Sequence, residues 1–432
     1  MRKTIWAAAM TAAFGTLATL SFHATADRDD DRRYGATKES VQLGPRPFYL
    51  VDGMEAGPLK HKLTQCMNGP FRKTDFSIGH RGAALQFPEH TKESYVAAIR
   101  QGAGIVECDV TFTSDGALVC RHAENDLHTT TNILLTPLAQ KCTKPFFPAV
   151  LDGDGKVITA ASAECRASDI TLAEFKSLRG KMDAFNPAAQ TPEQFVGGTA
   201  SWRTDLYTGR GTLLTLRESI ELNQRHDVKH TPELKSGDPS RIQAVFGGQS
   251  QYARKMAEEM QEAGVRPRDT WPQSFNVEDV FTWIDRTPYG KQAVYLLDYN
   301  AATNDIVIQA PYDKMDRSAY FKMLKKRGVQ IIAPPMPALL AVRSGKVVPS
   351  ALAHQLKKDF DIITWTLERS DLRAGTSRAG YYYDFDPNGE AIKTDGDMYK
   401  ALDVLAKDVK VLGIFSDWPA TVTYYANCMN LK

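Results

Sequence analysis

The segment TLRESIELNQRH at residues 215–226, followed by VKHTPEL at 228–234, contains the pattern that decides the fold. Its first part has apolar residues at the spacing of a helix. Its second part is one of the short apolar or β-branched segments that are typical of strands. Helices that alternate with strands are the building units of α/β proteins, so the number of such units along the chain decides the fold class.

Eight segments of the strand type recur along the 432 residues, and helical segments separate most of them. The expected strands are Phe76–Gly79, Gly104–Val110, Val228–Leu234, Thr270–Phe275, Ala293–Asp298, Val329–Ala333, Asp361–Thr366 and Leu412–Ser416. The expected helices are Lys92–Gln101, Thr215–His226, Arg241–Ala263, Asn276–Arg286, Ser318–Arg327, Pro349–Phe360 and Asp397–Val409. Strand and helix alternating in this way predict an α/β fold, a parallel (β/α)8 or TIM barrel.

Two stretches interrupt the alternation. Residues 112–119, FTSDGALV, carry an Asp-Gly pair between two β-type runs and predict a hairpin after the second strand. Residues 124–213 are too long for a loop between a strand and a helix, and they contain one helical pattern at Leu172–Leu178. We predict an inserted subdomain at about 124–213 within a barrel domain of residues 71–432. A separate domain boundary is the alternative.

The first 26 residues have the organisation of a secretory signal. Arg2 and Lys3 precede an apolar run from Ile5 to about Leu20, and an Ala-Thr-Ala cleavage site follows at 24–26. We expect a signal peptide at 1–26 and an N-terminal extension at 27–70. The protein is then exported, periplasmic or secreted, with no stable membrane insertion after cleavage. Retention of the run as a membrane anchor is the alternative, although it barely reaches spanning length.

Charge is balanced in this chain. The sequence has 53 Lys and Arg against 51 Asp and Glu, and the predicted signal carries two basic and no acidic side chains, which leaves 51 of each sign. Nucleic-acid-binding proteins carry a basic patch or stripe, and no Lys/Arg block occurs here. The sequence therefore predicts no nucleic-acid partner.

Six cysteines remain after the predicted cleavage, and export makes disulfides possible. Six cysteines allow 15 complete pairings. The expected bridges are Cys142–Cys165, which would close a two-stranded excursion around a Gly-rich turn, and Cys66–Cys428, near the two mature ends. Cys108 and Cys120 lie within strand patterns, where we expect buried thiols.

Three carboxylates predict a metal site. Glu107 and Asp109 are two residues apart on the second expected strand, so both side chains point to the same face of it. Such a pair alone is more often a surface feature. A third carboxylate, Glu233, lies near the end of the third expected strand, and Lys235 lies on the same face of that strand as Glu233. Carboxylate oxygens favour Ca²⁺ or Mg²⁺ over Zn²⁺. Lys235 could hold a phosphate oxygen opposite the metal.

Two histidines follow neighbouring strand segments. His80 stands in IGHRG at 78–82 and His122 in VCRH at 119–122. Because histidine titrates near neutrality, one of them can accept a proton while the other donates one. Arg81 adds a fork-shaped donor suited to phosphate, and Gly82 permits close backbone approach.

These residues belong to an ordered set of motifs that resembles the signature of the glycerophosphodiester phosphodiesterases. The matching motifs are Gly79-His80-Arg81-Gly82, Pro88-Glu89-His90-Thr91, Glu107-Cys108-Asp109, His122, Pro232-Glu233-Leu234-Lys235, Gln273-Ser274-Phe275, Trp365-Thr366 and Gly413-Ile414-Phe415-Ser416-Asp417-Trp418-Pro419. Each motif is short, but their order is specific, and the resemblance spans about residues 76–425. It implies an enzyme with a barrel fold and one bound divalent cation, with Ca²⁺ favoured over Mg²⁺.

The resemblance also implies roles for individual residues. It assigns catalysis to His80 and His122, cation binding to Glu107, Asp109 and Glu233, phosphate contacts to Arg81 and Lys235, and a supporting place at the rim to Glu89. Phe275 and Trp365 form either an apolar wall of the site or ordinary core packing. The chain departs from the family pattern after the second histidine, where Ala123 stands instead of Asp, so any carboxylate that orients His122 must come from elsewhere.

The implied reaction is hydrolysis of a small glycerophosphodiester to a glycerol phosphate and an alcohol. The nucleophile is either water or a substrate hydroxyl that forms a cyclic phosphate. A lipid headgroup phosphodiesterase on the same barrel and a binding protein without turnover are the alternatives. A further segment, Asp384–Gly389, resembles a calcium loop, but Pro387 within it favours a plain turn, and Tyr381 to Tyr383 before it could line the substrate entrance.

Overall fold

The computed structural model describes residues 41–431. The predicted signal peptide at 1–26 and the first part of the predicted N-terminal extension, 27–40, lie outside the described residues.

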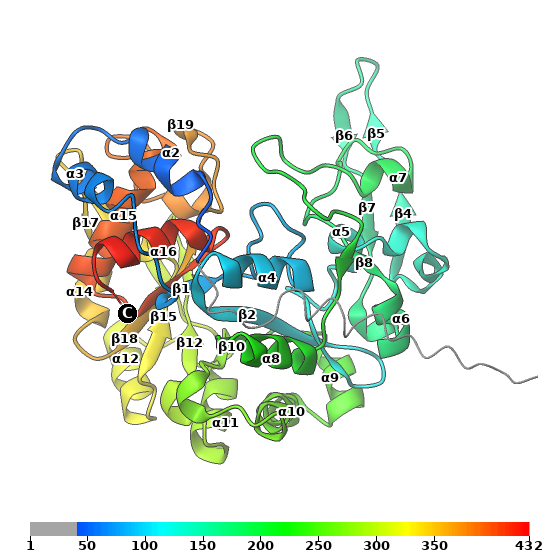
Figure 1. The fold of residues 1–432 in the computed structure, drawn as a ribbon. Coiled ribbons are helices and arrows are strands. Elements are labelled where there is room, and N and C mark those ends of the chain that lie inside the picture. The colour runs from blue at the N-terminus through cyan, green and yellow to red at the C-terminus, as the bar shows by residue number, and fades with distance from the viewer. Residues whose placement is uncertain (1–40, 432) are drawn as a thin grey trace, which may run out of the picture. The chain divides into compact units, whose positions relative to one another are not determined.

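Eight parallel strands close into a barrel (Figure 1). Their order is β1, β2, β10, β11, β12, β15, β18 and β20, and β20 pairs with β1 to complete the circle. Their bounds are β1 Thr74–Gly79, β2 Ala103–Phe112, β10 Lys229–Leu234, β11 Gln273–Ser274, β12 Val294–Leu296, β15 Ile331–Ala333, β18 Asp361–Leu367 and β20 Gly413–Ser416. The predicted (β/α)8 barrel is confirmed.

Helices surround the barrel. They are α4 Lys92–Arg100, α8 Leu216–Arg225, α9 Pro239–Phe246, α10 Gln249–Glu262, α11 Val277–Arg286, α12 Arg317–Lys326, α13 Met336–Leu339, α14 Ala351–Leu356, α15 Met398–Val404 and α16 Pro419–Cys428. Thr215 and Glu218 form a capping box, which explains why α8 begins at this point.

Three expected helices differ from the structure. The helix expected at 241–263 is two helices, because Gly247 has a φ of +82° and ends α9 in the left-handed conformation. The helix expected at 349–360 is shortened to α14, and a hairpin of β16 Leu340–Arg343 and β17 Lys346–Pro349 precedes it. The helix expected at 397–409 ends as α-helix at Val404 and continues as a π-helical turn to Val409.

Residues 124–213 form small elements with a core of their own. They contain the hairpins β4 Lys144–Phe147 with β7 Ser162–Glu164 and β5 Val150–Leu151 with β6 Val157–Thr159, the helices α5 Leu127–Thr130, α6 Leu172–Ser177 and α7 Pro192–Phe195, and the pair β8 Arg179–Gly180 with β9 Gly211–Thr212. Their buried apolar side chains, among them Ile133, Phe175 and Phe195, form one cluster. In Figure 1 these elements lie beside the barrel, and the β5–β6 hairpin projects from them.

The described part of the N-terminal extension packs on the last helix. It contains α2 Arg46–Asp52 and α3 Pro58–Gln65, and both contact α16. The remaining strands are β3 Leu118–Cys120, β13 Asp298–Asn300, β14 Asp305–Val307 and β19 Arg373–Thr376. The predicted hairpin after the second strand is present as β2 and β3.

All six cysteines form disulfides. Cys66–Cys428 and Cys142–Cys165 are paired as expected. The expectation of buried thiols at Cys108 and Cys120 was wrong, because the hairpin folds β3 back onto β2 and brings their Cα atoms to 5.2 Å, where a disulfide joins them.

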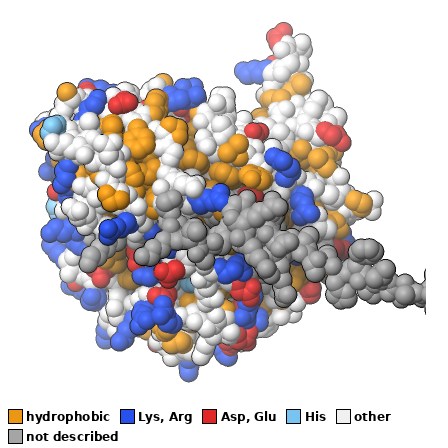
Figure 2. Space-filling model, viewed as in Figure 1, with side chains coloured by type: hydrophobic (Ala, Val, Ile, Leu, Met, Phe, Trp, Pro, Cys, Tyr) orange, Lys and Arg blue, Asp and Glu red, His pale blue; other side chains and the backbone are white. Residues whose placement is uncertain are grey.

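The barrel interior is packed with apolar side chains. Ile78, Ile105, Leu296, Ile363 and Phe415 belong to one buried cluster inside the closed sheet. The polar motif residues therefore gather at one end of the strands and not along the barrel axis. Over the face shown in Figure 2, outside the grey atoms, acidic and basic side chains are interspersed. Within residues 41–431, the structure contains no helix of the length and apolarity needed to cross a membrane.

Candidate active site

The motif residues meet at the carboxyl ends of the barrel strands. β1 ends at Gly79 and is followed by His80 and Arg81, while β3 is followed by His122. A cavity of about 600 Å³ opens at this end of the barrel. Eight of the nine predicted site residues line it: His80, Arg81, Glu107, His122, Glu233, Lys235, Phe275 and Trp365. The ninth, Asp109, is 1% exposed and lies next to Glu107 and Glu233. The C-terminal face of such a barrel is where active sites form.

The three predicted metal ligands form a compact cluster. One carboxylate oxygen each from Glu107, Asp109 and Glu233 lies within 4.8 Å of the others, and all three side chains are buried. Parallel pairing in register explains the geometry, because Glu233 of β10 lies opposite Asp109 of β2. Asp109 Oδ1 is buried and has no hydrogen-bond partner among the residues that the structure describes. A buried carboxylate oxygen without a partner is costly unless a ligand completes it.

Burial and neighbouring charges shift the pKa values of the three carboxyl groups. Burial and the neighbouring Asp109 carboxylate raise the pKa of Glu107 well above its usual value. Burial raises the pKa of Glu233 to about 7, against the opposing effect of Lys235. Burial also disfavours the charge of Asp109, but Lys235, His90 and Arg81 together hold its pKa well below the usual value. Three carboxylates this close cannot all ionise without a cation, and their donor set fits a hard divalent ion.

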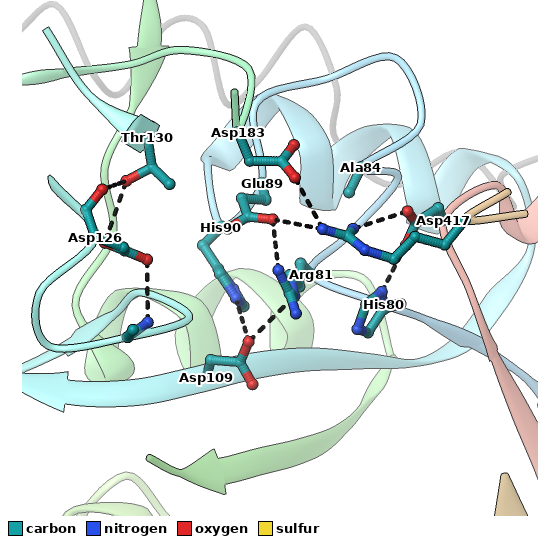
Figure 3. Close-up of polar contacts among 12 residues, drawn as sticks. His80, Arg81, Ala84, Glu89, His90, Asp109, Asp126, Thr130, Asp183 and Asp417 are labelled. Carbon is teal, nitrogen blue, oxygen red and sulfur yellow. Dashed lines mark hydrogen bonds and ion pairs between the residues drawn. The ribbon is translucent and has the colours of Figure 1, made fainter. Parts of the chain in front are cut away.

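Neighbouring groups hold the cluster in place. Gln273 Nε2 donates to Glu107 Oε1 at 2.9 Å, and the backbone N–H of Arg81 donates to Glu107 Oε2 at 2.9 Å. His90 Nε2 lies 2.8 Å from Asp109 Oδ2, a contact that Figure 3 shows. Lys235 Nζ lies 2.5 Å from Glu233 Oε1. Contacts of this kind orient metal-binding carboxylates.

His80 has a carboxylate partner. Its Nδ1 lies 2.5 Å from Asp417 Oδ1 (Figure 3). Its Nε2 lies 3.8 Å from Glu107 Oε2. Because an ionised carboxylate only accepts hydrogen bonds, Nδ1 carries the proton and Nε2 presents its lone pair to the site. Burial lowers the pKa of His80 although Asp417 opposes this. His80 therefore has the arrangement of a base that a carboxylate holds in one tautomer.

His122 differs from His80. Its ring makes no hydrogen bond within residues 41–431, and burial, together with Arg81 and Lys235, lowers its pKa well below the usual value. Asp126 accepts a hydrogen bond from the backbone N–H of Ala123 at 3.0 Å. The carboxylate near the second histidine thus holds the backbone beside His122 and does not contact its ring.

Arg81 is fixed by its neighbours and its backbone. Its φ is +53°, its Nη1 lies 2.8 Å from Glu89 Oε2, and its Nε lies 3.4 Å from Asp109 Oδ2. A positive φ at a residue other than glycine is strained and is common at functional sites. Gly82 does allow a close approach, but its neighbour is α4: a Cβ at this position would lie 2.4 Å from Ser94 Oγ.

Comparison with known proteins identifies the family. The profile of the glycerophosphoryl diester phosphodiesterase family matches residues 80–421, which is most of the chain. The chain belongs to this family. It is therefore an enzyme, a phosphoric diester hydrolase, and the resemblance read from its motifs is confirmed.

Individual relatives cover different shares of the chain. An extracellular protein of Arthroderma benhamiae is 37% identical over 255 residues, which are 58% of this chain and 100% of that relative. The probable glycerophosphodiester phosphodiesterase 1 of Mycobacterium tuberculosis is 53% identical over 47 residues, only 11% of this chain and 17% of that relative. A crystal structure from Silicibacter pomeroyi, provisionally named a glycerophosphoryl diester phosphodiesterase, superposes with a TM-score of 0.51 at 17% identity, covering 84% of this chain and 95% of its own. That likeness supports the fold.

Two walls enclose the cavity of the phosphodiesterase. One wall is aromatic: the rings of Phe275 and Trp365 lie edge to face with centroids 5.8 Å apart, and Tyr382 packs edge-on against Trp365 at 6.2 Å. Phe275 and Trp365 line the cavity, and both also pack against the apolar cluster inside the barrel. Tyr381 stacks on Trp365 beside the cavity without lining it. A second part of the lining comes from residues 124–213, which contribute Asp126, Thr129, Thr130, Asp183, Ala184 and Phe185.

Sequence reasoning missed several groups that shape the site. His90, Gln273 and Asp417 stood in the quoted motifs, so their motif positions were the signal that could have revealed their roles. Asp183 and Arg369 lie outside every motif, and nothing in their sequence context pointed to the cavity that they line. The segment Asp384–Gly389 forms a turn in which Asp386 accepts the backbone N–H groups of residues 390–392.

Proposed function

We propose that the enzyme hydrolyses small glycerophosphodiesters by acid–base catalysis with His80 and His122, at a divalent cation held by Glu107, Asp109 and Glu233. The observation that carries the proposal is their convergence. Three buried carboxylates, two histidines and two basic side chains meet at one cavity at the carboxyl end of the barrel. Phosphodiester hydrolysis needs this combination, since negative charge grows on the phosphoryl oxygens while protons are moved at two separate oxygens.

The residues fit a bound cation. An Asp109 Oδ1 without a hydrogen-bond partner within residues 41–431 and the raised pKa values of Glu107 and Glu233 are both expected of a carboxylate cluster that a divalent ion completes. When bound, the cation would polarise a phosphoryl oxygen and offset its growing charge. We propose Ca²⁺ over Mg²⁺, because Mg²⁺ usually takes one or two carboxylates with several waters, whereas Ca²⁺ accepts larger and less regular oxygen sets.

The two histidines would move the protons. His80, held by Asp417 through Nδ1, is placed to accept the proton of the nucleophile at Nε2. His122, which also lines the cavity, would donate a proton to the leaving oxygen, because the negative charge of a bound phosphodiester favours the protonated ring against the effects of burial, Arg81 and Lys235. The nucleophile is either water or a hydroxyl of the glycerol group.

Arg81 and Lys235 would bind the phosphate. Both basic side chains are buried at the cavity and already lie beside carboxylates of the cluster. A guanidinium can bind two phosphoryl oxygens at once, while the ammonium acts as a point charge. The aromatic wall of Phe275, Trp365 and Tyr382 would cover the apolar surface of the substrate.

We further propose that the enzyme acts outside the cytoplasm, as a periplasmic or secreted protein released by cleavage after residue 26. Three disulfides support this, because disulfides persist in oxidising compartments. The similarity to the extracellular protein of Arthroderma benhamiae supports it as well.

An assay with two substrates tests the proposed activity. Purified mature protein is incubated with glycerophosphocholine or with phospholipid vesicles, in Ca²⁺, in Mg²⁺ and after chelation. We expect release of glycerol phosphate from the soluble diester, dependent on the cation. Cleavage of the vesicles alone would identify a lipid headgroup phosphodiesterase instead, and no turnover of either substrate would indicate a binding protein.

Substitution of His80 tests the mechanism. His80→Ala should lower kcat at least ~100-fold, the size expected for the loss of a general base. His354→Ala removes an exposed histidine from α14 and serves as the matched control. Full activity of His80→Ala would contradict the assigned mechanism.

A further inference from the structure

Half-buried ion pairs connect residues 124–213 to Asp417, the partner of His80. Asp417, which contacts His80 Nδ1 through Oδ1, accepts Arg369 Nη1 at its second oxygen at 2.9 Å. The other end of the Arg369 fork, Nη2, donates to Asp183 Oδ2 at 2.8 Å. Figure 3 shows Asp183, Asp417 and His80 along this path. Two carboxylates from distant parts of the chain thus fix one planar guanidinium.

Asp183 is itself held firmly. Its second oxygen, Oδ1, accepts Arg203 Nη2 at 2.6 Å. Arg203 also donates to the carbonyl oxygens of Ala84 and Leu85, at 2.6 Å and 3.2 Å. These carbonyls belong to the loop that follows His80 and Arg81, so the inserted residues contact the catalytic loop at two points.

The contacts of Asp183 decide between two roles. Asp183 lines the cavity and would therefore be a candidate for direct contact with the substrate. Each of its oxygens, however, already accepts an arginine, and the two guanidinium groups hold its pKa well below the usual value. Its carboxylate is therefore engaged by protein groups, and its effect on the reaction passes through Arg369.

Arg369 needs this second partner. Its side chain is 21% exposed and lies between Asp417, Asp183 and the more distant Glu89 at 3.7 Å. Without Asp183, the guanidinium would lose the hydrogen bond that fixes one end of its fork. It could then turn toward Glu89, and Asp417 would lose the contact that keeps Oδ1 directed at His80.

We infer that Asp183 is a positioning residue for catalysis: through Arg369 and Asp417 it fixes the ring of His80, so that the insertion completes the active site of the barrel. The inference rests on the proposed catalytic role of His80. It makes residues 124–213 part of the catalytic apparatus and not only a cover of the cavity.

Kinetics of Asp183→Asn test the inference. Because a misplaced base slows the chemical step without weakening the binding of phosphate, we expect kcat to fall about tenfold to 100-fold while KM changes less than about twofold. Asp183→Glu keeps the charge and should recover most of kcat. Asp169→Asn is the matched control, since Asp169 also lies in the insertion, pairs with an arginine, Arg241, and is equally exposed, at 16% against 15%.

A proton NMR measurement tests the same inference without turnover. A proton held between His80 Nδ1 and Asp417 should resonate far downfield, and Asp417→Asn assigns the signal by its loss. We expect the signal to be lost or moved upfield in Asp183→Asn and unchanged in Asp169→Asn. If the wild type hydrolyses no diester but this pattern holds, the positioning role stands and the proposed function fails.

Other outcomes would overturn the inference. A rise of KM alone would make Asp183 a substrate contact. An unchanged kcat with an unchanged proton signal would show that the ion pairs do not position His80. Should Asp183→Asn fail to fold, Arg203→Lys weakens the same connection from its other end, and a kcat equal to that of the wild type would contradict the inference.

Discussion

His80 and His122 occupy different surroundings, although both border the same cavity. Asp417 contacts His80 Nδ1, and Asp417 in turn accepts a hydrogen bond from Arg369. His122 makes no ring hydrogen bond within residues 41–431, so its orientation depends on the backbone that Asp126 holds. His80, the proposed proton acceptor, is therefore the more firmly held of the two, and His122, the proposed donor, can adjust to the leaving oxygen.

Asp417→Asn should reduce turnover while leaving the cation site intact. The amide removes the charge that fixes the Nδ1–H tautomer, and the loss of such a partner costs on the order of 100-fold in kcat. Steady-state kinetics measure the change, and calorimetric titration with Ca²⁺ should give the affinity of the wild type. A kcat within threefold of the wild type would show that Asp417 does not orient His80.

Asp109→Asn should weaken cation binding. Asp109 is the member of the cluster with the lowered pKa, and its Oδ1 has no hydrogen-bond partner in the described part of the chain, so we expect it to carry the negative charge that attracts the cation. We expect Ca²⁺ affinity to fall ~10-fold or more by calorimetry. Asp115→Asn, in the exposed turn of the same hairpin, is the control. Equal affinities of the two variants would exclude Asp109 as a ligand.

At the scale of elements, the β2–β3 hairpin connects the metal site with the second histidine. Cys108 stands between Glu107 and Asp109 on β2, and its partner Cys120 stands two residues before His122. The disulfide therefore fixes the strand that supplies two proposed ligands against the segment that supplies one proposed catalytic group. This was not predicted, because each cysteine was judged within its own strand and not across the hairpin.

Removal of this disulfide should affect both stability and activity. In the Cys108→Ser/Cys120→Ser variant, the lost constraint on a loop this short is worth about 3 kcal/mol in the free energy of unfolding. We also expect kcat to fall, because His122 loses its fixed distance from the cluster. The Cys142→Ser/Cys165→Ser variant should lose stability alone. Denaturant unfolding measures the stability of both variants, and steady-state kinetics measure their kcat. An equal fall of kcat in the two variants would show that the Cys108–Cys120 disulfide has no specific effect on the active site.

His230 on β10 should make stability depend on pH. Burial lowers its pKa from 6.5 to about 4, and its Nδ1 lies 3.4 Å from Asn223 Nδ2 of α8. The unfolded chain then binds a proton more readily than the folded one, so this stabilisation is complete above pH 6.5 and is lost as the pH falls toward 4. Between pH 7 and 4.5, the free energy of unfolding of the wild type should fall by about 2–3 kcal/mol more than that of His230→Gln. Parallel loss in both proteins, measured by urea unfolding, would contradict this.

The elements show what periodicity can predict. All eight barrel strands were expected from short β-type segments, because a buried parallel strand has a continuous apolar signature. The helix expected at 241–263 was wrong only at Gly247 and Gly248, where the left-handed conformation of Gly247 outweighs an unbroken helical pattern. Boundaries thus depend on single residues, while the existence of an element depends on many.

At the scale of the whole molecule, the described chain combines a family barrel with ninety residues that the barrel pattern does not require. The sequence could place the motif side chains in one site, because strand alternation and the shared ends of parallel strands bring them together. It could not place Asp183 and Phe185 at the cavity, because they lie in irregular segments whose path follows from tertiary packing. The connection from Asp183 to His80 spans residues 80 to 417 and has no local sequence signal.

We propose that the cavity hydrolyses a glycerophosphodiester with a bound cation. The most direct measurement is the initial rate of glycerol phosphate release from glycerophosphocholine by the mature protein, before chelation, after chelation, and after Ca²⁺ is added back. In the wild type, we expect turnover that chelation abolishes and added Ca²⁺ restores. In Asp109→Asn, the same Ca²⁺ concentration should not restore turnover. Turnover that persists after complete removal of divalent cations would contradict it.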